Sequence, residues 1–158
     1  EAQGLGEAFA MMSRQPVLLL DTNVRHPSLH ELLQVAPEPG LTDYLIGTAQ
    51  FDAVVHSTSV IGLSVVPAGN STASSAAEVA QAERYASLLD IARQRFRYVI
   101  LDSAPMLPYA DSVILAHQVD GAVIVLSQRE RRKSEAAEMT RLLHGLNTKI
   151  FGAILSRS

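Results

Sequence analysis

Two short apolar segments, each ending in an aspartate, constrain the fold of this chain more than any other feature. Residues 17–21 read VLLLD and residues 98–102 read YVILD. Segments that are apolar on both faces are typical of buried strands in a parallel sheet, and such strands place polar groups in a ligand crevice at their carboxyl ends. Asp21 and Asp102 are therefore the first candidate site residues.

The remaining segments indicate an α/β protein with a mostly parallel sheet and helices on both faces. Apolar periodicity predicts helices over residues 2–13, 76–94, 108–117 and 131–146. Further strands are predicted over 121–126 and 150–155, and β-branched residues between 51 and 67 favour short strands or a hairpin. Because strands and helices alternate in the second half and no linker interrupts the pattern, we expect one domain over residues 1–158.

Polar residues after the first strand predict two short helices. Ser28 is placed to cap a helix that runs through Leu33, with Glu31 completing a capping box. Thr42 is placed to cap a second short helix through Ile46, and residues 69–75 read as a small polar loop.

Charge and composition exclude several classes of protein. The formal charge of −3 argues against nucleic acid as a partner, and the absence of cysteine excludes disulfides and thiol catalysis. No apolar run approaches the ~20 residues that cross a bilayer. We expect the sequence, which opens on Glu1, to be part of a longer chain.

The two aspartates allow a catalytic and a structural interpretation. A carboxylate at the end of a buried strand can hold Mg²⁺ or orient a water molecule, and it can equally cap the following turn. The presence of two such strands favours the first interpretation for Asp21 and Asp102. Nearby, Arg25 could contact phosphate or form a surface ion pair, while Asn23 and Ser103 could hydrogen-bond to a ligand.

Other features of the sequence have simpler interpretations. The Gly4-Leu5-Gly6 segment follows no strand and precedes no lysine, so its small residues are expected to let a helix approach the sheet. The basic run over residues 129–133 reads as the start of a solvated helix face, and the five histidines form no ligand pattern.

The chain resembles the bacterial tyrosine autokinases of capsule and exopolysaccharide synthesis, which are P-loop ATPases related to septum-positioning and plasmid-partition ATPases. The resemblance covers nearly the whole chain and rests on LLLDTNVRHPSLHELL, EPGLTDYLIG, LSVVPAG, YVILDSAP, VDGAVIVLSQ and IFGAILSR, in that order. It implies that Asp21, Asn23 and Arg25 form a second Walker-type motif and that Asp102 is the Walker B aspartate. By the same resemblance, Asp21 and Asp102 would organise Mg²⁺ for bound ATP.

The sequence departs from this family at three points. The family's Walker A loop is missing, and the chain has only two lysines, Lys133 and Lys149, both far downstream of Asp21. Asn23 stands where the family has a second carboxylate. The family's tyrosine cluster is also absent, because the four tyrosines are dispersed along the chain.

Three functions remain open on these grounds. The first is an ATPase or tyrosine-autokinase-like domain in exopolysaccharide or capsule biosynthesis. Its nucleotide site is then either degenerate or completed by an upstream lysine outside this sequence, as the resemblance implies. The second is a non-catalytic regulatory partner of a membrane polysaccharide copolymerase, and the third is a partition-type ATPase that acts as a spatial switch. The resemblance implies self-association, a membrane polysaccharide copolymerase or chain-length regulator as partner, and a cytoplasmic location at the inner face of the membrane through that partner or a further segment. The negative formal charge predicts no nucleic-acid partner.

Overall fold

The computed structural model describes residues 2–69, 78–104, 116, 118–127 and 132–156. These residues form two compact units, the first over residues 2–103 and the second from residue 104 onward. The expectation of one domain over residues 1–158 stays a prediction. No described helix is both long enough and apolar enough to cross a membrane.

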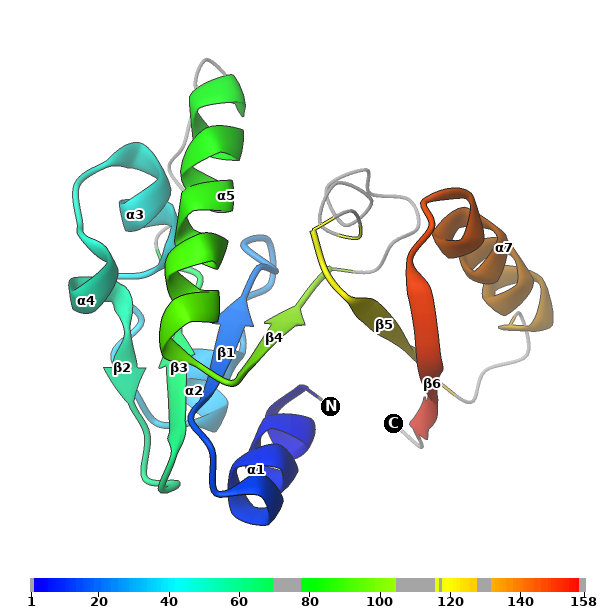
Figure 1. Cartoon of the computed structure of the whole chain (residues 1–158), viewed down its shortest axis with the longest axis horizontal. Coiled ribbons are helices and arrows are strands. Elements are labelled where there is room, and N and C mark those ends of the chain that lie inside the picture. Colours follow the sequence, from blue (N-terminus) through cyan, green and yellow to red (C-terminus); the bar gives the residue numbers. More distant parts are fainter. Residues whose placement is uncertain (1, 70–77, 105–115, 117, 128–131, 157–158) are drawn as a thin grey trace. The chain divides into compact units, whose positions relative to one another are not determined.

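The first unit contains a four-stranded sheet in the order β2-β3-β1-β4 (Figure 1). Strands β3, β1 and β4 are parallel, and the short β2 pairs antiparallel with β3. All five residues of β1 are buried, as expected for a central strand. The bounds are β1 Val17–Asp21, β2 His56–Ser57, β3 Leu63–Val66 and β4 Tyr98–Asp102.

Helices lie on both faces of this sheet, and Figure 1 shows α5 in front of it and α2 behind. Val17 and Leu19 of β1 share a buried cluster with Ala10 of α1 and with Leu29 and Leu33 around α2. On α5, Leu88, Leu89 and Ala92 are buried. The bounds are α1 Ala2–Ser13, α2 Leu29–Leu32, α3 Leu41–Ile46, α4 Phe51–Val54 and α5 Glu78–Arg95.

Gly6 brings α1 close to the sheet. A Cβ atom at Gly6 would lie 2.8 Å from Cδ2 of Leu19, a distance at which one side chain must move. The prediction that small residues let this helix approach the sheet is therefore confirmed at Gly6. Gly4 has nothing within 4 Å of its Cβ position, so it has no such role.

The second unit contains a parallel pair of strands, β5 Gly121–Ser127 and β6 Lys149–Ser156, and the helix α7 Arg132–Gly145. Leu143 of α7 and Ile124 of β5 form the centre of its buried cluster, with Ala116. Val123, Val125 and Phe151 remain exposed.

The α/β class with a mostly parallel sheet is confirmed, and three local predictions are wrong. The hairpin predicted between 51 and 67 is confirmed by the antiparallel pair β2–β3. Only its first part is wrong: Phe51–Val54 is a helical turn rather than a strand, because Phe51 and Val54 are buried three residues apart and Gln50 O accepts from two backbone N–H groups. The Ser28 side chain makes no capping hydrogen bond, and Gly40 rather than Thr42 caps α3. Most of the predicted helix over 108–117 and of the loop over 69–75 lies outside the described residues.

A close backbone contact fixes α3 beside the end of β3. The N–H groups of Leu41 and Thr42 donate to the carbonyls of Pro67 and Ala68 at 2.7 and 3.0 Å, and Gly40 N donates to Oδ2 of Asp43 at 2.7 Å. A Cβ atom at Gly40 would lie 2.5 Å from the Pro67 oxygen. The glycine is therefore required by the close approach of two backbones.

Replacing Gly40 with alanine tests this contact. We expect Gly40→Ala to lower the free energy of unfolding by about 2 kcal/mol, since the added methyl group meets backbone atoms that cannot rotate away. Gly4→Ala is the matched control and is expected to raise it by up to about 1 kcal/mol, because alanine favours the helix. Urea denaturation of the two variants measures both values, and equal values for both variants would contradict the contact.

Candidate functional site

Asp21 and Asp102 lie side by side at the carboxyl edge of the first sheet. Strands β1 and β4 are parallel neighbours, and these two residues are partners in their register. Paired residues on neighbouring parallel strands point to the same face, with strands about 4.8 Å apart. The structure thus brings together the two carboxylates that the sequence singled out.

The Asp21 carboxylate is fully buried and organises the loop that follows β1. Its Oδ1 accepts from the backbone N–H of Asn23 at 3.2 Å, and its Oδ2 accepts from Ser28 N and Leu29 N, both at 3.1 Å. Asp21 therefore satisfies the N-terminal end of α2 in place of the Ser28 side chain. This is the turn-capping role, and a carboxylate has further lone pairs with which to hold a metal or water.

Thr22 links the ends of the two strands, a role that its position in the sequence did not predict. Both its backbone N–H and its hydroxyl donate to the carbonyl oxygen of Asp102, at 2.8 and 2.7 Å. The sequence feature that could have predicted this role is a hydroxyl residue directly after the aspartate that ends a strand. Thr22 positions the backbone that carries the second carboxylate.

The two carboxylates repel each other. Burial raises the pKa of Asp102 above its usual range, and the charge of Asp21 raises it further. Since the folded protein then binds this proton more tightly than the unfolded chain does, stability falls as pH rises from the ordinary carboxyl pKa through the raised one. Above that window the folded state holds two adjacent negative charges, an arrangement that a divalent cation would relieve.

The replacement Asp102→Asn should remove this repulsion. At neutral pH and without Mg²⁺ we expect the variant to unfold with a free energy about 1 kcal/mol higher than that of the wild type. In the wild type, the free energy of unfolding falls as pH rises from the ordinary carboxyl pKa through the raised pKa of Asp102. This fall should be smaller in the variant. Urea denaturation across a pH series measures both, with Asp90→Asn, at an exposed surface ion pair, as the control that changes little.

The other predicted site residues lie on the same edge. Asn23 is half-buried, and its side-chain oxygen accepts from His26 N at 3.3 Å. Arg25 is exposed on the loop between β1 and α2, and Ser103 is exposed directly after β4. The roles of all five residues toward a ligand stay predictions.

The donor set fits a magnesium ion held with the help of its water molecules. Within the part of the chain that the structure describes, no three acidic or histidine side chains gather into a metal cluster. Mg²⁺ is usually bound by one or two carboxylates together with waters and substrate phosphates. Asp21 and Asp102 match that pattern.

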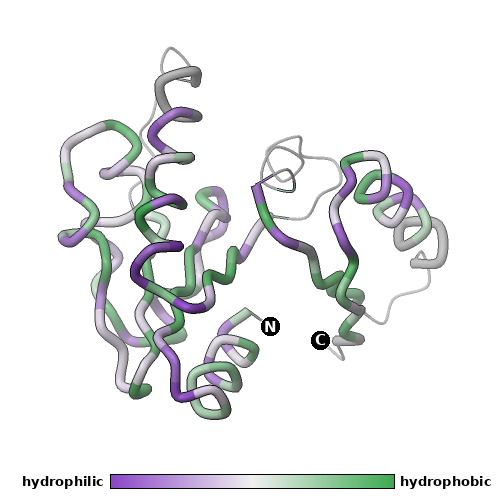
Figure 2. Tube along the Cα trace, in the orientation of Figure 1, coloured by the Kyte–Doolittle hydropathy of each residue, from purple (hydrophilic) through white to green (hydrophobic). Residues whose placement is uncertain are grey.

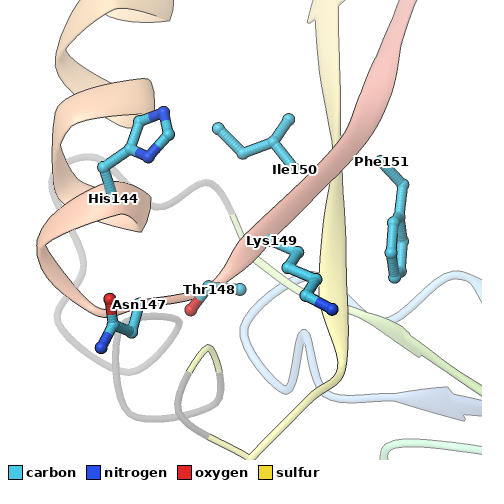
Figure 3. Close-up of a pocket in the computed structure, with 6 residues that line it drawn as sticks. All are labelled: His144, Asn147, Thr148, Lys149, Ile150 and Phe151. Atoms are coloured by element: carbon cyan, nitrogen blue, oxygen red, sulfur yellow. The ribbon is translucent and has the colours of Figure 1, made fainter.

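A shallow hollow of about 430 Å³ in the second unit is a weaker candidate. Figure 3 shows its six lining residues, with Phe151 across β6 from His144 at the end of α7. The hollow lies at the amino end of β6, whereas ligands of α/β sheets bind at the carboxyl ends of strands.

No family model matches the chain. It is 30% identical over 156 residues to the succinoglycan biosynthesis transport protein ExoP of Rhizobium meliloti, with 96% of this chain and 20% of ExoP covered. It is 29% identical to the tyrosine-protein kinase YwqD of Bacillus subtilis, with 98% of this chain and 65% of YwqD covered. The chain thus spans a fifth of one relative and about two thirds of the other.

Solved structures show the same fold. The kinase domain of VpsO superimposes with a TM-score of 0.87 at 26% identity, over 99% of this chain and 76% of that domain. The septum site-determining protein MinD of Pyrococcus horikoshii, complexed with Mg-ADP, has a TM-score of 0.80 at 17% identity, over 99% and 63%. The resemblance found in the sequence is confirmed: homologues of the chain include bacterial tyrosine-protein kinases, and its fold is that of P-loop ATPase-like kinase domains.

Proposed function

We propose that the chain is a nucleotide-binding domain of the tyrosine-autokinase type that works in exopolysaccharide or capsule biosynthesis. The observation that carries this proposal is the pair of adjacent carboxylates, Asp21 and Asp102, at the carboxyl edge of a kinase-like sheet. ATP is the proposed substrate and Mg²⁺ the proposed cofactor.

Each residue at this edge has a proposed role. Asp21 and Asp102 hold Mg²⁺ directly or through water, and bound Mg²⁺ neutralises negative charge on the phosphate oxygens. Arg25 donates to a phosphate oxygen, for which its planar guanidinium is suited. Ser103 donates from its hydroxyl to a phosphate or a metal-bound water, and Asn23 adds an amide hydrogen bond.

The opposite side of the nucleotide needs a lysine and a glycine-rich phosphate loop. Of the two lysines, Lys149 begins β6 at the amino end of that strand, and Lys133 lies in α7. We propose that a lysine outside this sequence completes the site, as the resemblance implies. ATP binding by the 158 residues alone is then expected to be weaker than binding by the completed site and to depend on Mg²⁺.

A non-catalytic regulatory partner is the second candidate. Asn23, in place of the carboxylate that the resemblance implies, favours it. In this case the domain keeps its fold to assemble with a membrane polysaccharide copolymerase at the inner face of the membrane, and with further copies of itself. ExoP, named as a transport protein of succinoglycan biosynthesis, is a relative that points in this direction.

Calorimetry on the chain, with and without Mg²⁺, separates the two candidates. A heat of binding for ATP that requires Mg²⁺ supports the nucleotide-binding domain. A second assay adds the proposed segment that carries the lysine missing from this sequence, and tyrosine autophosphorylation in its presence would distinguish a kinase from a simple ATPase. If ATP binds neither to the chain alone nor to the chain with that segment, the result would favour the non-catalytic regulatory partner.

A further inference from the structure

The first unit has a second continuous surface at the edge opposite Asp21 and Asp102, where β1, β3 and β4 begin. Three connections meet there: the ones leading from α1 into β1, from β2 into β3 and from α5 into β4. Val17 N donates to Gly62 O at 2.8 Å, and Arg97 N donates to Pro16 O at 2.9 Å. We call residues 11–17, 58–62 and 93–97 the amino-edge surface.

Large apolar side chains project from the amino-edge surface into solvent. Ile61 is 94% exposed at the tip of the β2–β3 connection, and Met11 and Met12 are 73% and 86% exposed in the last turn of α1. These are the three highest exposures among the large apolar residues that the structure describes. Figure 2 shows the apolar tip of the β2–β3 connection at the lower end of the unit. Protruding side chains of this kind do not form a groove.

The same surface is basic, although the chain as a whole carries a formal charge of −3. Its three segments contain four arginines and no acidic residue. Arg93 pairs with Asp90, and Arg95 pairs with Asp52. Neither Arg14 nor Arg97 forms an ion pair with any residue that the structure describes. Positive charge is therefore concentrated at this edge of an acidic protein.

We propose that the amino-edge surface docks on an anionic phospholipid membrane. Arginines attract anionic head groups, while exposed methionine and isoleucine side chains enter the boundary between head groups and acyl chains. A symmetric contact between two copies of this surface is less favoured, because it would place arginines of the two copies opposite each other, and facing like charges are unfavourable. Docking through this edge turns Asp21 and Asp102 away from the bilayer, so the candidate site stays open to solvent. Membrane docking through this surface does not depend on nucleotide binding.

Co-sedimentation of the full chain with vesicles tests this proposal. We expect binding to vesicles of an equal mixture of phosphatidylcholine and phosphatidylglycerol, weakening with salt, and little binding to phosphatidylcholine alone. The double variant Arg14→Gln/Arg97→Gln should weaken binding about 30-fold, since each neutralised arginine costs about fivefold. The triple variant Met11→Gln/Met12→Gln/Ile61→Ser should weaken binding at least tenfold.

Matched controls exist for both variants. Arg141→Gln/Lys149→Gln removes the same charge from exposed positions of the second unit, and Leu32→Gln/Ile46→Gln removes exposed apolar side chains elsewhere in the first unit. Circular dichroism and urea denaturation check that each variant folds. Absence of vesicle binding, or binding weakened equally by the controls, would overturn the proposal. Self-association that requires the same arginines and methionines, without vesicle binding, would assign the surface to a protein contact instead.

Discussion

Asp21→Ala is expected to lower the free energy of unfolding by about 3–5 kcal/mol. The carboxylate has no exposed surface and accepts three backbone hydrogen bonds, from Asn23, Ser28 and Leu29. Alanine would leave these N–H groups without their acceptor and leave a cavity at the end of a buried strand. Since native domains are stable by only ~5–15 kcal/mol, this loss is a large fraction of the total.

Asp21→Asn is a milder substitution, and its stability can be compared with that of Asp21→Ala. The amide keeps the size of the side chain and one acceptor oxygen but replaces the second oxygen with a donor. We expect a loss of stability between those of the wild type and Asp21→Ala. Urea denaturation at neutral pH measures all three proteins, and a value for Asp21→Ala within 1 kcal/mol of the wild type would contradict the role of Asp21 in holding the loop.

Asp102→Ala is expected to weaken Mg²⁺-dependent ATP binding by about 100-fold, which corresponds to roughly 2.7 kcal/mol. The variant removes one of the two carboxylates proposed to hold Mg²⁺ but breaks no hydrogen bond that the structure gives to the Asp102 side chain. Calorimetry in the presence of Mg²⁺ measures the affinity.

The expected stability of the Asp102 variants separates a loss of ATP affinity from a loss of folding. Because changes at Asp102 relieve repulsion with Asp21, they are not expected to unfold the protein. Asp90→Ala serves as a control for the removal of a surface carboxylate. An affinity for Asp102→Ala within threefold of the wild type would remove Asp102 from the metal site while leaving the fold intact.

Neighbouring carboxylates thus have opposite expected effects on stability, and the sequence could not separate them. Both residues end an apolar strand, and both were assigned the same role from that pattern. The difference comes from the chain that follows each strand: the loop after Asp21 folds back to present Ser28 N and Leu29 N to it. The path of this loop depends on tertiary structure, so it leaves no periodic pattern in the sequence.

Local patterns did predict the elements that position the site. The helix over residues 2–13 and the strand over 98–102 were predicted with the bounds that the structure shows. Parallel pairing followed from the apolar character of the strands. The contact between Gly40 and Pro67 could not be predicted in this way, because the two residues are far apart in sequence and meet only in the folded chain.

Manganese-induced broadening of amide resonances tests the central claim most directly, because Mn²⁺ substitutes for Mg²⁺ at carboxylate and phosphate oxygens. With ADP present, we predict that the amides of Thr22 and Asn23 after β1 and of Asp102 and Ser103 at the end of β4 broaden first. Residues 144–151 around the hollow of the second unit should stay sharp. Selective broadening at residues 144–151, or no selective broadening at Thr22 and Ser103, would contradict a metal–nucleotide site between Asp21 and Asp102.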